Sequence, residues 1–216
     1  MVGVLGVSAS AILVRFSQAP SGVTAAYRLG WTVLLLLPVV LLRCRAELRR
    51  VTARDLVLCG ASGVLLALHF LTWFESLKRT SVASSTVLVS TEVIFTALGF
   101  ALFLHGKIPR LGVWAILLAF GGSALLALSG GGGAGELSGN LLALAAASAA
   151  AVYTLIGRIQ RGHLSTTVYT FLTYLACFLT LLLGTAAAGT PLTGYGGREW
   201  LIGLALAVLC TLLGHS

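Results

Sequence analysis

Few side chains in this sequence could carry chemistry, and the ionisable ones that interrupt long apolar runs need the most explanation. Glu92 is the eleventh of the 23 residues in the apolar run 82–104. An ionisable group at the centre of a bilayer costs about 2.5–3.5 kcal/mol, so it needs a physical reason. We interpret Glu92 either as a cavity-facing carboxylate that binds a cationic group or exchanges a proton, or as a neutral or arginine-paired carboxyl that fixes helix packing.

Arg28 is the candidate partner of Glu92, and it lies in the apolar run 23–42. With a helical rise of about 1.5 Å per residue, Arg28 is about 7.5 Å from Val23, and Glu92 is about 15 Å from Val82. A long arginine side chain can bridge that difference in depth. The alternatives are that Arg28 anchors the carboxylate of a substrate, or that its charged end extends to the membrane interface.

His69 and Trp73 are four residues apart, so they share one face of a helix, which Leu66 and Ser62 continue. The histidine could exchange protons near neutral pH, and the tryptophan could bind an organic cation or a ring. The alternative is a hydrogen-bonded packing histidine beside an interface tryptophan. Tyr153 and Tyr27 are weaker candidates, because such tyrosines more often pack than bind.

Two other polar features have simpler interpretations. Glu75 precedes Lys78 and Arg79 by three and four residues, which predicts an ion pair at the helix surface. A hydroxyl-rich stretch either supports close contact between helices or forms a polar cavity wall. This stretch contains Ser84, Ser85, Thr86, Ser90 and Thr91.

The sequence contains no pattern typical of a metal, a cofactor or an intramembrane enzyme. The four cysteines, Cys44, Cys59, Cys177 and Cys210, have no CxxC spacing and are interpreted as small packing residues. The glycine-rich run 129–135 is followed by no Gly-Lys-Ser/Thr, so a flexible linker is favoured over a phosphate loop. Neither a His-x-x-x-His nor a Glu-x-x-His spacing occurs. We therefore expect no cofactor, no metal and no enzymatic activity.

The composition shows which elements must position these residues. The chain is 58% hydrophobic and 9% charged, whereas a soluble domain is typically about 45–50% apolar and about 25% charged. The apolar runs are continuous rather than alternating, which predicts membrane-spanning helices and not barrel strands. Eight such runs cover residues 2–16, 23–42, 56–74, 82–104, 111–128, 141–157, 166–185 and 200–214.

The net charge of +8 is interpreted as an orientation signal and not as nucleic-acid binding. With a cytoplasmic N-terminus, nine basic residues fall in inner loops and four on the outer side. The inner ones are Arg43, Arg45, Arg49, Arg50, Arg54, Lys107, Arg110, Arg158 and Arg161, and the outer ones are Arg15, Lys78, Arg79 and Arg198.

The segment 68–90, LHFLTWFESLKRTSVASSTVLVS, resembles helices three and four of EamA-type transporters of the drug/metabolite transporter superfamily. The segments 10–15, 19–20 and 25–29 resemble the first two helices of that family, and 211–216 resembles the matching part of its second repeat. The sequence departs from the family pattern at Val93, where a proline is usual, and at Gly106, where a glutamate is usual.

The resemblance implies two inverted five-helix repeats with cytoplasmic termini. We expect an all-α polytopic bundle, with a first repeat over 1–129, a linker over 130–138 and an incomplete second repeat over 139–216. About seven to eight helices of the usual ten would then be present, as in a C-terminally truncated member. A weak internal echo at a shift of 146 residues places His215 on His69, which makes His215 a further candidate.

The implied function is secondary transport of small metabolites, amino acids or drugs across the plasma membrane by alternating access. The partners expected are a small solute and the lipid bilayer, with homodimerisation as one way to complete the missing wall. The alternative function is that of a fragment that associates with other membrane subunits and transports nothing on its own.

Overall fold

A computed structural model describes residues 10–106, 108–129 and 134–212, and all the regular structure in these ranges is helical. The chain divides into two compact units. Unit 1 comprises Met1–Ala67 and Ile156–Ser216, and unit 2 comprises Leu68–Leu155. This architecture confirms the predicted all-α helical bundle.

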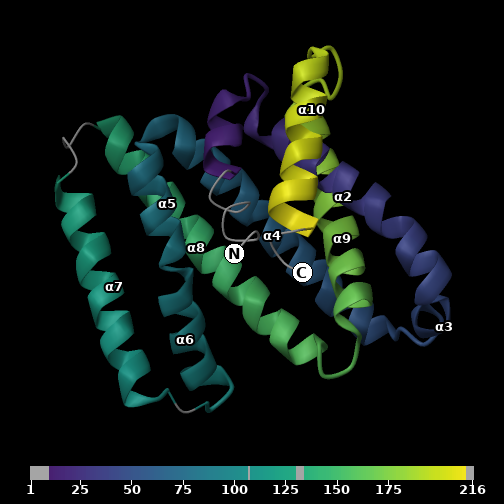
Figure 1. The fold of residues 1–216 in the computed structure, drawn as a ribbon, viewed down its shortest axis with the longest axis horizontal. Coiled ribbons are helices and arrows are strands. Elements are labelled where there is room, and N and C mark those ends of the chain that lie inside the picture. Colours follow the sequence, from purple (N-terminus) through teal and green to yellow (C-terminus); the bar gives the residue numbers. More distant parts are fainter. Residues whose placement is uncertain (1–9, 107, 130–133, 213–216) are drawn as a thin grey trace. The chain divides into compact units, whose positions relative to one another are not determined.

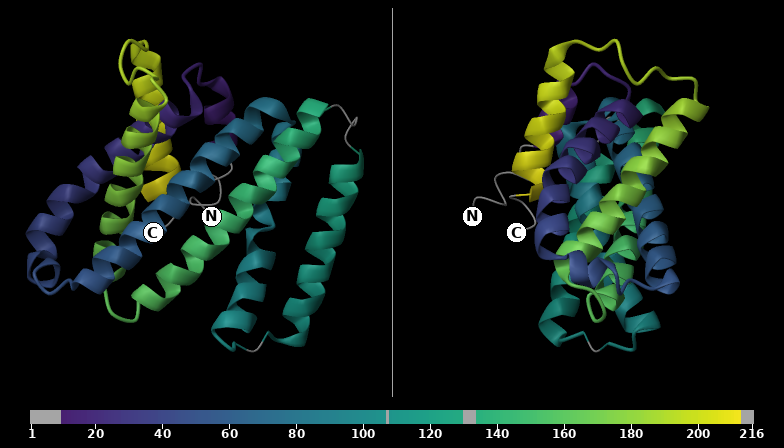
Figure 2. Two further views of the ribbon diagram at one scale, coloured as in Figure 1. Left: turned by 180° about the vertical axis from the view of Figure 1, so that it is seen from behind. Right: turned by 90° about the vertical axis from the view of Figure 1, so that its right-hand side faces the viewer.

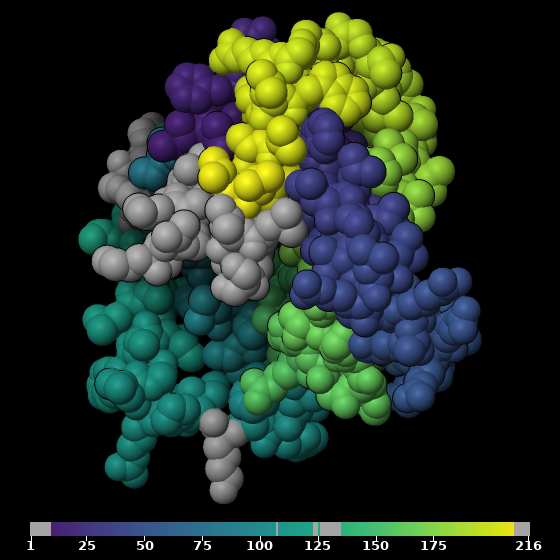
Figure 3. Space-filling model, turned by 45° about the vertical axis from the view of Figure 1, so that its right-hand side comes forward, coloured from purple at the N-terminus to yellow at the C-terminus, as the bar shows by residue number. Residues whose placement is uncertain are grey.

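Unit 1 is built on α2 (Ser21–Arg43), which packs against α9 (Thr166–Ala187) and α10 (Gly197–Ala205) (Figures 1 and 3). The hydroxyl of Ser165 accepts a hydrogen bond of 3.3 Å from the Val168 amide and so caps the start of α9. Close packing on α10 needs Gly203, because a Cβ at that position would lie 2.7 Å from the Cβ of Tyr27.

Five further segments complete unit 1. They are a helical segment over residues 10–16, the short α3 (Arg45–Leu48), the parts of α4 (Ala53–Arg79) and α8 (Ala134–Gln160) that belong to this unit, and a π-helical continuation of α10 over Leu206–Leu212.

Unit 2 contains α5 (Val82–Ser90), α6 (Glu92–Phe103), α7 (Arg110–Ser129) and the remaining parts of α4 and α8. Ser81 caps α5, because its hydroxyl accepts a hydrogen bond of 3.0 Å from the Ser84 amide. In this unit α8 lies beside α4 (Figure 2), and the hydroxyl of Thr80 donates to the Asn140 side-chain oxygen over 3.0 Å.

Five helical spans of the described chain, one of them made of α5 and α6 together, are long and apolar enough to cross a membrane. They span Ser21–Arg43, Ala53–Arg79, Val82–Phe103, Gly135–Gln160 and Thr166–Ala187. Many large apolar side chains are exposed, including Leu111 at 82% and Leu118 at 77%. Such extensive apolar exposure suits contact with lipid better than contact with water.

Two predicted boundaries differ from the structure. The run 82–104 is not one helix, because Thr91 interrupts it. Residues 134–138, expected in the linker, instead form the first turns of α8. Glu136 in the first turn favours a helix N-terminus there. Gly139 lets this end of α8 approach α4 closely, because a Cβ at Gly139 would lie 2.9 Å from the amide nitrogen of Thr80.

Candidate functional site

The break between α5 and α6 lies near the middle of the 82–103 span (Figure 1). The Thr91 amide donates over 3.1 Å to the Leu88 carbonyl, which is three residues earlier and not four. The Thr91 hydroxyl donates to the same carbonyl over 2.6 Å. The regular four-residue pattern of backbone hydrogen bonds is therefore interrupted at this break.

A pocket of about 320 Å³ lies on the α5 side of this break. It is lined by Thr86, Val87, Ser90 and Thr91, and by Ala119 and Gly122 of α7. A Cβ built on Gly122 would meet no atom within 4 Å, in keeping with open space at this position. The volume falls at the lower end of the range of small-ligand pockets, about 300–1,000 Å³.

The hydroxyl-rich stretch serves both of the purposes considered for it. Ser84 and Ser85 are buried, and Ser85 accepts a hydrogen bond of 2.9 Å from Ser76 of α4, which joins the two helices. On the pocket wall, by contrast, the Ser90 hydroxyl donates over 2.7 Å to the Thr86 carbonyl. The Thr86 hydroxyl has no hydrogen-bond partner among the described residues. This oxygen is buried in the pocket wall, so a hydrogen bond to a ligand would require the Thr86 side chain to turn toward the pocket.

Glu92 is the first residue of α6 and is half-buried. A carboxylate at this position is stabilised by the positive end of the helix dipole, so it does not depend on an arginine alone. Glu92 directly follows the pocket residues Ser90 and Thr91 but does not line the pocket itself. The pair with Arg28 stays a prediction, because Arg28 belongs to unit 1 and Glu92 to unit 2.

His69 and Trp73 share one face of α4, as predicted. Their rings stack with centroids 5.9 Å apart and an interplanar angle of 28°. The His69 Nδ1 lies 3.0 Å from the Ala146 carbonyl oxygen of α8, which matches the packing alternative for this histidine. Trp73 is 8% exposed, and its indole nitrogen has no hydrogen-bond partner among the described residues. His69 thus takes part in the contact between α4 and α8, and the indole nitrogen of Trp73 is left without a hydrogen-bond partner in the described chain.

The remaining candidates are Arg28, Tyr153 and His215. Arg28 is 5% exposed and is buried on α2 within unit 1. Tyr153 is half-buried on α8 in unit 2. His215 falls outside the described residues. Of these three, Tyr153 is the one that lies in the same unit as the pocket, and it does not line the pocket.

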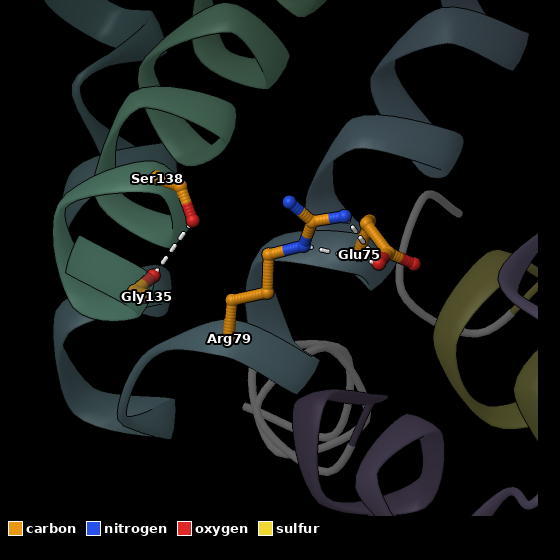
Figure 4. Close-up of polar contacts among 4 residues, drawn as sticks. All are labelled: Glu75, Arg79, Gly135 and Ser138. Atoms are coloured by element: carbon orange, nitrogen blue, oxygen red, sulfur yellow. Dashed lines mark hydrogen bonds and ion pairs between the residues drawn. The ribbon is translucent and has the colours of Figure 1, made fainter.

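The predicted surface ion pair on α4 is confirmed (Figure 4). Arg79 donates from its Nε and Nη2 atoms to one oxygen of Glu75, over 3.1 and 3.0 Å. Both side chains are substantially exposed, so the pair contributes little to stability.

Sequence reasoning missed a polar contact inside unit 1. The Ser62 hydroxyl of α4 lies 2.6 Å from the Tyr169 hydroxyl of α9, and both residues are buried. Gly157 of α8 makes room for this tyrosine, because a Cβ there would lie 2.8 Å from its hydroxyl oxygen. The only available signal was that Ser62 shares its helix face with His69 and Trp73.

Sequence reasoning also missed Glu199, which lies just before the predicted apolar run 200–214. It is 7% exposed, and its carboxylate accepts hydrogen bonds from the Ser17 hydroxyl over 2.6 Å and the Gln18 amide over 3.1 Å. The adjacent Trp200 stacks on Tyr27 with ring centroids 4.1 Å apart. These contacts attach the start of α10 to the segment before α2, which is a structural task.

Among the described residues, no three histidine, cysteine, aspartate or glutamate side chains gather as a metal site would require. Cys59 and Cys177 are buried and Cys44 is half-buried, and all three are free thiols.

Comparison with known proteins identifies the family. The model of the EamA-like transporter family matches residues 1–128. A solved crystal structure shares the fold with a TM-score of 0.66 at 19% identity, over 99% of this chain and 74% of the other. No curated protein matches the sequence significantly.

Proposed function

We propose, from the premise that the chain belongs to the EamA-like transporter family, that the pocket beside Thr91 forms part of a solute path. The family makes the chain a multi-pass membrane protein of the drug/metabolite transporter type, and the family is one of transporters and not of enzymes. The solutes we propose are small metabolites, amino acids or drugs. They would cross the plasma membrane by alternating access between two inverted repeats.

The observation that carries this proposal is a small pocket at a helix break near the middle of a membrane span, with three hydroxyl residues in its largely apolar wall. Transporters commonly bind their solutes where membrane helices are discontinuous, because backbone groups are freed there. Thr86, Ser90 and Thr91 offer hydroxyls to a polar but uncharged part of a solute. Glu92, next in the chain, would receive a cationic group or exchange a proton.

The other predicted site residues enter the proposal in secondary roles. His69 and Trp73 would line or gate the path from α4, and Arg28, Tyr153 and His215 would contribute when the repeats rearrange. We also propose a cytoplasmic N-terminus and a homodimer as the transporting form. The basic residues counted above support the orientation.

The alternative is a membrane subunit that associates with other chains and transports nothing itself. It predicts no flux for the purified chain and no effect of pocket substitutions. Transport by the chain alone, abolished by a change in the pocket, would exclude this alternative.

Flux into vesicles tests the proposal. The full chain would be reconstituted in liposomes and screened for counterflow of radiolabelled amino acids and a quaternary ammonium cation. Thr86→Val removes the unpartnered hydroxyl while keeping the side-chain shape, and we expect about a five-fold loss of flux, as for one lost hydrogen bond.

The matched control is Ser148→Ala, which removes an exposed hydroxyl that donates to the Ala145 carbonyl over 2.9 Å. This control should keep wild-type flux. Equal flux in all three proteins would argue against a role of the pocket.

A further inference from the structure

Seven arginines gather at one end of unit 1, where α2 ends, α4 begins and α8 ends. All seven are exposed. This basic patch consists of Arg43, Arg45, Arg49, Arg50, Arg54, Arg158 and Arg161.

Hydrogen bonds hold the two segments of the patch together. The Ser165 amide, at the start of α9, donates over 2.6 Å to the Glu47 carboxylate of α3. The Gln160 side chain, at the end of α8, donates over 3.1 Å to Asp55 at the start of α4. Figure 1 shows α3 and the turn between α8 and α9 at the same end of this unit. The five arginines of residues 43–54 and the two of residues 158–161 therefore form one surface, although more than 100 residues separate the two groups in the sequence.

The acidic residues within the patch are already engaged. Glu47 accepts the Ser165 amide, and Asp55 accepts from Gln160 and, over 2.7 Å, from the Thr52 hydroxyl. The side chains of Arg49, Arg50 and Arg54, by contrast, make no hydrogen bond or ion pair with any described residue. The patch thus has a strong excess of positive charge that is available to a partner.

Exposed apolar side chains lie next to the patch. Leu42 is 84% exposed, Val57 is 70% exposed and Ile159 is 44% exposed. Each is within three residues of a patch arginine along the chain. This juxtaposition of exposed apolar and basic groups is the one expected where hydrocarbon meets lipid headgroups.

We propose that the basic patch binds the phosphate headgroups of anionic phospholipids. Arginine forms paired hydrogen bonds with phosphate oxygens in a fixed planar geometry. Clusters of four to eight basic residues directly beside a membrane helix are typical of attraction to anionic lipid. The proposal concerns lipid affinity of the folded protein, and it holds whether or not the chain transports a solute.

Lipid binding to the full chain in detergent tests the proposal, read out by native mass spectrometry. Titration with dimyristoyl phosphatidylglycerol should give tighter binding than dimyristoyl phosphatidylcholine. Each arginine removed should weaken phosphatidylglycerol binding about five-fold, so Arg49→Gln/Arg50→Gln/Arg54→Gln should weaken it about a hundred-fold.

Two further triple variants separate patch binding from net charge. Arg49→Lys/Arg50→Lys/Arg54→Lys keeps the positive charge and should keep most of the affinity. Lys78→Gln/Arg79→Gln/Arg198→Gln removes the same charge outside the patch and should leave the affinity unchanged. Circular dichroism would verify that each variant keeps its helicity. The single variant Arg50→Gln tests lipid binding in the same way with the least disturbance of the structure.

Four results would overturn the proposal. They are equal affinity of the wild type for the two lipids, an unaltered affinity in the glutamine triple variant, an equal loss in the control triple variant, and displacement of the lipid by inorganic phosphate at millimolar concentration. The last result would assign the patch to free anions.

Discussion

At the residue scale, the same side-chain types either join helices or stay without a partner in the wall of a pocket. Ser62 and Tyr169 are buried and paired with each other, whereas Thr86 lines a pocket and has no partner in the described chain. Composition alone does not separate these cases, because the difference depends on which neighbouring helix lies opposite the hydroxyl. Because Ser62 of α4 lies opposite Tyr169 of α9, the hydroxyls of these two residues form a packing contact between the helices.

The Ser62–Tyr169 contact can be measured with a double-mutant cycle. Ser62→Ala and Tyr169→Phe each remove one hydroxyl, and we expect a coupling free energy of about 0.6 kcal/mol, as is typical between membrane helices. Reversible unfolding in mixed micelles gives the free energies. Strictly additive single effects would show that the two hydroxyls do not interact.

At the element scale, backbone approach decides which helices meet. A Cβ at Gly63 of α4 would lie 2.7 Å from the Cys177 amide nitrogen and 2.7 Å from the Thr173 carbonyl oxygen of α9. A Cβ at Gly60, one turn earlier, would meet nothing within 4 Å. The α4–α9 contact therefore requires glycine at position 63 but not at position 60.

These two glycines form a matched pair for a stability test. Gly63→Ala forces backbone atoms apart and should destabilise the chain by about 1–3 kcal/mol, as overpacking does. Gly60→Ala should be neutral or slightly stabilising, because alanine favours helix more than glycine. Unfolding in detergent measures both, and equal stabilities of the two variants would contradict the packing described.

The helix break makes a second prediction at this scale. Val93 is the second residue of α6 and so lies in the first turn of that helix, where a proline is well tolerated. Val93→Pro should keep the stability within about 1 kcal/mol, whereas Leu98→Pro, inside α6, should cost about 3 kcal/mol or more. Thermal unfolding compares them, and a large loss in Val93→Pro would mean that α5 and α6 form one helix.

Much of this architecture can be predicted from the sequence. Continuous apolar runs predicted the long helices, and the four-residue spacings predicted the Glu75–Arg79 pair and the common face of His69 and Trp73. The break at Thr91 was not predicted, because hydropathy is continuous across it. The burial of Glu199 was not predicted, because it depends on Ser17, 182 residues away in the chain.

At the scale of the whole molecule, charge and hydropathy act together. The described chain has five helices that suit a membrane, and the family is one of membrane transporters. The basic patch lies beside exposed apolar residues, and its arginines all belong to the set that a cytoplasmic N-terminus would place inside. The orientation and the lipid proposal therefore share the same residues but make separate predictions.

The orientation is tested with reporter fusions in cells. A reporter inserted at Gly132 should lie on the outer side of the membrane, and one inserted at Arg50 should lie in the cytoplasm. Enzymatic reporters that are active on only one side give the readout. Cytoplasmic activity at Gly132 would reverse the proposed topology.

The central claim is that the pocket beside Thr91 belongs to an aqueous solute path, and thiol labelling tests it most directly. In a chain whose four native cysteines are replaced by alanine, Ser90→Cys would be exposed to a membrane-impermeant thiol reagent after reconstitution in liposomes. The control, Leu118→Cys, replaces a residue of α7 that is 77% exposed and expected to face lipid. We predict that Ser90→Cys is labelled and Leu118→Cys is not, and an unreactive Ser90→Cys would contradict the account.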